Sequence, residues 1–122
     1  MRYMLLCYDD EPYWENAGTE AHRAAMNEAV GLTHELDHKG QYLLASPLHP
    51  TSTATTVRVR DGKPTMTDGP FAETREVLGG FYLIEADNLD DAISIAVRHP
   101  GVHVGAVEIR PVLEIPGLPR RK

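Results

Sequence analysis

The sequence contains a single cysteine, no excess of basic residues and no long apolar run. Cys7 has no second cysteine for an internal disulfide and no cluster for zinc or iron–sulfur, so we expect a buried strand residue. Twelve Lys and Arg against eighteen Asp and Glu give a formal charge of -6, which disfavours nucleic acid and anionic membranes as partners. The apolar run at residues 3–8 is too short for a signal peptide or a membrane span. We therefore expect a cytoplasmic protein.

A chain of 122 residues can build one hydrophobic core but not two ordinary domains. We predict one domain over residues 1–122, of which 113–122 form a proline-containing C-terminal tail. Two segments, 2–8 and 79–86, are apolar on both alternating faces, which predicts central strands. Residues 41–48 and 106–112 also read as strands.

Helices are expected at residues 20–39, capped by Thr19, and at 89–99, capped by Asn88. The acidic stretch 9–18 between the first strand and the first helix reads as a loop. The first helix should lie on the sheet along a buried stripe of small and apolar side chains, formed by Ala21, Ala25, Ala29, Leu32 and Leu36.

A hairpin is predicted around Asp61-Gly62, a dipeptide that accepts the positive φ angles of a type I′ turn. This register pairs Val57 with Met66 and Val59 with Pro64. The whole order is β-α-β-(hairpin)-β-α-β, which predicts a ferredoxin-like α+β fold. Two helices cover only one face of such a sheet, so the apolar second face predicts a homodimer in which the sheets of two copies pack into an α+β barrel.

The run from Thr67 to Tyr82 carries a family signature. It reads Asp68-Gly69-Pro70-Phe71, then Glu73-Thr74-Arg75-Glu76, then Leu78-Gly79-Gly80-Phe81-Tyr82. It resembles the DGPF-domain branch of the YCII-related family, and the resemblance extends to residues 3–6, 57–62 and 107–112. That resemblance implies the dimeric α+β barrel. Most DGPF-type proteins have no assigned reaction, and related proteins are often encoded beside extracytoplasmic-function sigma factors.

One YCII-type protein is a dehydrochlorinase of a chlorinated hydroxyquinol. The resemblance implies that this branch uses a His on the first helix and an Asp just before the Pro that ends the second helix. The matching positions here are Ala29 and His99, so this His/Asp pair is missing and that chemistry is not carried over. His99 is instead assigned to the helix dipole, and His22 to no site.

The signature offers Asp68 as a candidate catalytic carboxylate, because it leaves an edge strand just before the Gly69-Pro70 turn. Glu73 and Glu76, at i, i+3 spacing, are expected on one side of a helical turn with Arg75 between them. Such a cluster suits a general base beside an anion-binding cation. The alternative is a structural turn held by ion pairs.

The remaining catalytic candidate is His49, as a second base. The remaining candidates for substrate binding are Phe71, Arg58, Tyr8 and Tyr82. The two tyrosines are expected to face a cavity between subunits.

The segment from His34 to His38 matches the H-E-x-x-H pattern of zinc proteases. Leu36 belongs to the buried stripe, and the two His lie roughly 160 to 180° around the helix from it, toward solvent. We therefore expect neither a metal nor another cofactor. The sequence favours a lyase-like or proton-transfer enzyme acting on a small organic molecule. The alternative is a non-catalytic ligand-binding or accessory module linked to sigma-factor regulation.

Overall fold

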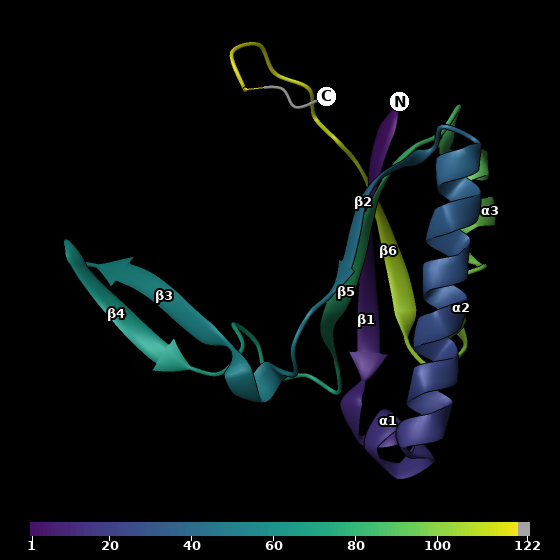
Figure 1. Ribbon diagram of the computed structural model, residues 1–122. Coiled ribbons are helices and arrows are strands. Elements are labelled where there is room, and N and C mark those ends of the chain that lie inside the picture. The colour runs from purple at the N-terminus through teal and green to yellow at the C-terminus, as the bar shows by residue number, and fades with distance from the viewer. Residues whose placement is uncertain (120–122) are drawn as a thin grey trace.

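The computed structural model describes residues 1–119. One antiparallel sheet has the strand order β2-β5-β1-β6, and helices α2 and α3 cover one of its faces (Figure 1). A separate two-stranded hairpin, β3–β4, projects away from the sheet on the side opposite the helices (Figure 1). The elements, in order, are β1 Arg2–Asp10, α1 Glu11–Ala17, α2 Thr19–His38, β2 Tyr42–Pro47, the 3-10 turn Thr51–Thr53, β3 Thr55–Arg60, β4 Lys63–Asp68, β5 Glu76–Glu85, α3 Leu89–Ala96, the 3-10 turn Pro100–His103 and β6 Ala106–Pro111.

The core lies between this sheet and the helices. Leu36 of α2 packs there with Leu5 of β1 and Ile84 of β5, and each of these three side chains is 1% exposed or less. Burial of each such side chain stabilises the fold by about 1.5 to 3 kcal/mol. Only the C-terminal half of α2 reaches the core. Ala21 is exposed, which corrects the expectation of a stripe buried along the whole helix.

The stretch 9–18 is not a loop. Strand β1 continues to Asp10, which pairs with Glu76, and a short helix α1 follows directly. Asp10 caps that helix by accepting a hydrogen bond from the Tyr13 amide at 3.1 Å. Pro12 lies in the first turn, where its missing N–H breaks no helical bond. The next helix begins at Thr19, and its N-cap is Gly18 with a φ of 96°, rather than Thr19.

The local predictions for the hairpin and for α3 are confirmed. Val57 pairs with Met66 and Val59 with Pro64, and Asp61 and Gly62 have φ angles of 51° and 74°. The Asn88 side chain caps α3 by accepting from the Asp91 amide at 2.9 Å. This helix ends at Ala96, three residues before the predicted end.

The second face of the sheet carries apolar side chains and no helix. Met4, Leu6, Phe81 and Leu83 are half-buried there, and Leu44 of β2 is 52% exposed. Three apolar side chains on the hairpin are more exposed still: Val57 at 61%, Val59 at 65% and Met66 at 72%. Within residues 1–119, no helix is long and apolar enough to cross a membrane.

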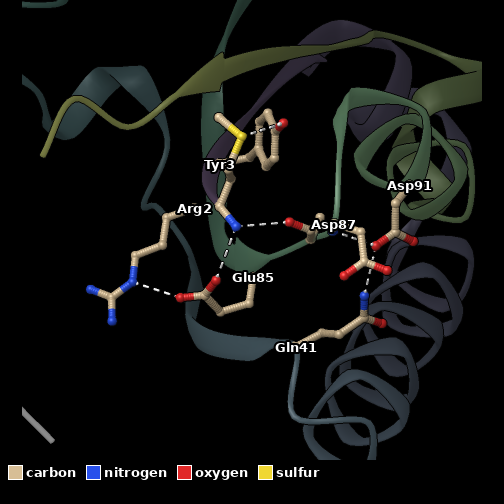
Figure 2. A network of polar contacts seen from close by, with 8 residues as sticks. Arg2, Tyr3, Gln41, Glu85, Asp87 and Asp91 are labelled. Atoms are coloured by element: carbon tan, nitrogen blue, oxygen red, sulfur yellow. Dashed lines mark hydrogen bonds and ion pairs between the residues drawn. The ribbon is translucent and has the colours of Figure 1, made fainter.

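The two ends of the sheet differ in what holds them. At the start of β1, Arg2 forms an ion pair with Glu85 at 2.8 Å. Nearby, the Asp91 carboxylate accepts from the Gln41 side chain at 3.2 Å and from the Asp87 amide at 3.0 Å (Figure 2). These contacts close one end of the sheet. The other end, where β1 finishes, opens into a cavity.

Candidate functional site

A cavity of about 220 Å³ lies between the N-terminal half of α2, the sheet and the segment that follows α3. It exists because α2 reaches the core only through its C-terminal half. The walls are mostly small or apolar, with Ala25, Met26, Ala29 and Val30 on the α2 side and Tyr42, Ala45 and Pro47 on the β2 side. The polar side chains Asp9, His22, Tyr82 and His99 also line it.

Asp9 reaches the cavity through the alternation of strand β1. Leu5 and Cys7 point toward the helices, and Asp9 continues this face beyond the last core residue. Gly79 leaves room for its carboxylate, and Gly101 lies against it. A Cβ on Gly79 would overlap Oδ2 of Asp9, and a Cβ on Gly101 would lie 3.5 Å from Oδ1. Gly79 of the signature therefore has a steric reason: it accommodates the Asp9 side chain.

The environment of Asp9 favours its protonated form. Burial is the main cause of its raised pKa, the carboxylate of Glu11 adds to it, and His22 acts in the opposite direction. Glu11 is fixed nearby, because its carboxylate accepts from the Thr51 amide at 3.0 Å and from the Thr51 hydroxyl at 2.5 Å. Within residues 1–119, no donor forms a hydrogen bond with the Asp9 carboxylate.

The Tyr82 hydroxyl lies 2.8 Å from Nδ1 of His99, and the two rings meet edge to face at 77°. Burial raises the pKa of Tyr82, which stays a neutral phenol, and lowers the pKa of His99, which favours neutral imidazole. Since Tyr82 occupies Nδ1, the other ring nitrogen is the one available to a ligand. A Cβ on Gly101 would lie 2.9 Å from that Nε2, so His99 Nε2 and Asp9 Oδ1 border the same glycine.

Helix α1 supplies an aromatic wall. Trp14 is half-buried and lines the cavity, and its ring contacts the His22 ring edge to face at a centroid distance of 5.8 Å.

Cys7 also lines the cavity, and its side chain is buried as predicted. Burial raises the pKa of the Cys7 thiol to about 12. A thiol of this kind carries almost no thiolate at neutral pH and is a poor nucleophile.

Of the candidates predicted from the sequence, only Tyr82 lines the cavity. Its side chain faces the helices, which corrects the expectation that it faces a partner subunit. Tyr8 lies on the other face of the sheet, where its hydroxyl is 3.2 Å from Glu108 Oε1. His49 is exposed in the segment after β2.

The signature loop lies apart from the cavity. Asp68 ends β4 and is exposed, and Arg58 lies over the Phe71 ring at 5.3 Å. Residues 71–75 form no helical turn, so Glu73 lies in irregular structure and Glu76 in strand β5. This corrects the expected clustering of the two Glu residues.

Arg75 does not bridge Glu73 and Glu76 either. It binds the Asp10 carboxylate at 2.9 Å and so anchors the loop to the end of β1. His34 and His38 of the H-E-x-x-H segment are exposed, as predicted from the helical periodicity.

Sequence reasoning missed Asp9, His22 and His99 as cavity residues. A signal was present for each. Asp9 continues the inward face of β1 with a charge where a core residue is expected. His22 precedes Ala29 by seven residues, which is two helical turns and thus the same face of α2. Ala29 and His99, the two positions indicated by the dehydrochlorinase branch, both line the cavity.

The fold and the cavity define a small α+β protein with two histidines, a tyrosine and a half-buried carboxylate at one end of an antiparallel sheet. The chain belongs to the YCII-related domain family, whose pattern matches residues 1–116. An uncharacterised protein of Rhizobium meliloti strain 1021 is 34% identical over 114 residues, which is 92% of each chain.

A solved structure resembles the fold. The 5-chloro-2-hydroxyhydroquinone dehydrochlorinase of Burkholderia phenoliruptrix AC1100, in complex with 2,5-dihydroxybenzoquinone, superposes with a TM-score of 0.52 over 93% of this chain and 94% of that one. The sequence identity is 14%, so the likeness concerns the fold.

Proposed function

We propose that the cavity is the active site of a small-molecule enzyme that transfers protons in an elimination of the lyase type. The observation that carries the proposal is the Asp9 carboxylate, which has a raised pKa, no hydrogen bond within residues 1–119, and a neutral His99 beside it. Buried ionisable groups with opposed pKa shifts are typical of acid–base sites. Small-molecule chemistry on this fold is also supported by the dehydrochlorinase that it resembles.

The two pKa shifts assign the roles of base and acid to His99 and Asp9. The lowered pKa keeps His99 neutral, and in the tautomer that donates Nδ1–H to Tyr82 its Nε2 lone pair is free to accept a proton. Asp9, whose pKa is raised, is the acid. In an elimination, a C–H proton of the substrate passes to His99 Nε2, the C–H electrons form the new double bond, and the leaving group departs with the proton of Asp9. Proton transfer from His99 back to Asp9 restores the site.

Proton exchange tests this proposal without a known substrate. A panel of enolisable ketones and dihydroxybenzenes is incubated with the protein in D₂O, and loss of C–H signal is followed by NMR. We expect exchange with the native chain, a loss of at least about 100-fold in His99→Gln and Asp9→Asn, and native rates in Glu108→Gln. A ligand that binds the cavity with no exchange would instead favour the ligand-binding or accessory module.

The finer description of the fold is also a proposal. The strand order with both helices on one face supports a ferredoxin-like arrangement, and the signature supports membership of the DGPF branch. The apolar second face supports packing of two sheets in a dimeric α+β barrel. In such a dimer the exposed apolar side chains of the hairpin would contact the partner subunit. A catalytic or ligand-binding role for Asp68 stays a separate proposal from the sequence, with a structural turn as its alternative.

A further inference from the structure

The charge of the cavity selects its ligand. We propose that this site, taken as the active site proposed above, accepts small flat molecules that are uncharged or cationic and present a hydrogen-bond donor to Asp9, and that it rejects anions. The lining contains one carboxylate and, within residues 1–119, no Lys or Arg. A ligand carboxylate or phosphate would therefore meet no compensating Lys or Arg, and Asp9 in its deprotonated form would repel it.

The neighbouring groups reinforce this selection. Glu11, fixed by Thr51, places a further carboxylate next to Asp9, and the same effect that raises the pKa of Asp9 disfavours an anionic ligand there. His99 and Tyr82 are neutral and offer hydrogen bonds without charge. His22 is the remaining ionisable side chain of the polar end, and it lies at the exposed rim against Trp14. Repulsion between like charges is strong where water is partly excluded, because the effective dielectric constant is low.

The shape and surface of the cavity point to a flat ligand. Aromatic rings lie on three sides, with Trp14 from α1, Tyr42 from β2 and Tyr82 from β5. Such rings also attract an organic cation, which a carboxylate next to them stabilises further. The Asp9 oxygens accept no hydrogen bond from residues 1–119 but are accessible to solvent, so a ligand that displaces water from them must supply a donor in its place. A hydroxyl or an ammonium group meets this requirement, and a carboxylate does not.

Three probes that share a phenyl ring and a two-carbon side chain test the inference: 2-phenylethanol, 2-phenylethylamine and phenylacetate. Their binding to the full-length native chain is measured at pH 8 by NMR titration, following the ring signals of Tyr82 and His99. We expect the alcohol and the amine to bind in the cavity and phenylacetate to bind at least about tenfold more weakly than the amine. In Asp9→Asn, the difference in affinity between the amine and phenylacetate should fall to less than about threefold.

Two controls isolate the effect of Asp9. Glu108→Gln removes one negative charge on the opposite face of the sheet and should keep the native ratio. Replacing Arg120, Arg121 and Lys122 with Gln removes the three cations outside the described residues and should also keep it. Phenylacetate binding as tightly as the amine, or absence of all three probes from the cavity, would overturn the inference.

The outcome is separable from that of the proposed function. Selection against the anion without proton exchange leaves the charge inference intact and removes the enzyme proposal. Proton exchange on anionic substrates would support the enzyme proposal and overturn the charge inference.

Discussion

His99 is oriented by Tyr82, whose hydroxyl lies 2.8 Å from Nδ1 and comes from the central strand β5. Tyr82 is 4% exposed, so its position is fixed by the core rather than by solvent-exposed contacts. The hydrogen bond joins the sheet to the segment after α3. It leaves Nε2 of His99 facing the cavity.

Removing that hydroxyl should affect both stability and chemistry. Tyr82→Phe leaves Nδ1 of the buried His99 without a partner, and we expect a loss of about 1 to 3 kcal/mol in the free energy of unfolding. The tautomer is no longer fixed, so proton exchange should fall by at least about tenfold with little change in probe affinity. The matched control is Tyr8→Phe, whose hydroxyl contacts Glu108 on the other face and whose loss should change neither quantity. Equal effects of the two substitutions would contradict the orienting role.

The adjacent carboxylates Asp9 and Asp10 should respond to pH in opposite ways. The pKa of Asp9 is raised, so its contribution to stability is fully present below the pKa of the unfolded chain and is lost as the pH rises through the folded value. Asp9→Asn should therefore melt at a higher temperature than the native chain at pH 7, and the gain should shrink toward about pH 4. Thermal unfolding at a series of pH values measures this.

Asp10 provides the matched control. Its pKa is lowered, chiefly by the hydrogen bond from Arg75, so its contribution is present above the unfolded pKa and is lost as the pH falls through the folded value. Asp10→Asn keeps an N-cap residue for α1 and removes only the charge. This variant should melt below the native chain at pH 7 and approach it in acid. If Asp9→Asn and Asp10→Asn both melted above the native chain at pH 7, overall negative charge, and not the local environment, would set their stability.

Two glycines distinguish a steric role from a conformational one. Gly79→Ala places a Cβ on Asp9 Oδ2, so we expect a loss of about 1 to 3 kcal/mol in stability together with weaker binding of the amine probe. Gly31 lies within α2 with nothing within 4 Å of its Cβ position, and Gly31→Ala should stabilise the protein by about 0.4 to 1 kcal/mol. Denaturant unfolding measures both. Unchanged binding in Gly79→Ala would show that the carboxylate does not depend on this glycine.

The exposed apolar face predicts a dimer. Light scattering at micromolar concentration should give twice the 13.5 kDa of one chain. Leu44→Asp puts a charge on the open face of the sheet and should shift the mass toward that of the monomer. Leu118→Asp changes a side chain of similar exposure in the tail and should leave the dimer intact. A compact monomeric native chain would remove the dimeric barrel from consideration.

Asp68 tests whether the signature loop reaches the ligand. Asp68 is exposed and does not line the cavity, so Asp68→Asn should change the free energy of unfolding by less than about 0.5 kcal/mol and probe affinity by less than about twofold. Asp9→Asn is the positive comparison. A sharp loss of affinity in Asp68→Asn would mean that the hairpin reaches a site, in agreement with the sequence-based prediction.

Local features were predictable because they depend on neighbouring residues. The Asp61-Gly62 turn, the Asn88 cap and the outward position of His34 and His38 each follow from short-range geometry, and all were confirmed. The error at residues 9–18 has a local cause as well. The acidic composition and Pro12 suggested a loop, although Asp10 is a suitable cap and Pro12 is tolerated in a first helical turn.

By itself, the sequence determined the order of the strands and of helices α2 and α3, the two central strands and the family signature, because periodicity and turn chemistry depend on contiguous residues. Only the tertiary structure decided where the cavity lies. Asp9, His22, Tyr82 and His99 come from β1, α2, β5 and the segment after α3, and they meet because α2 stands off the sheet at its N-terminal half. The signature residue Gly79 has its steric role only in that arrangement, since the atom that it accommodates belongs to a strand seventy residues earlier.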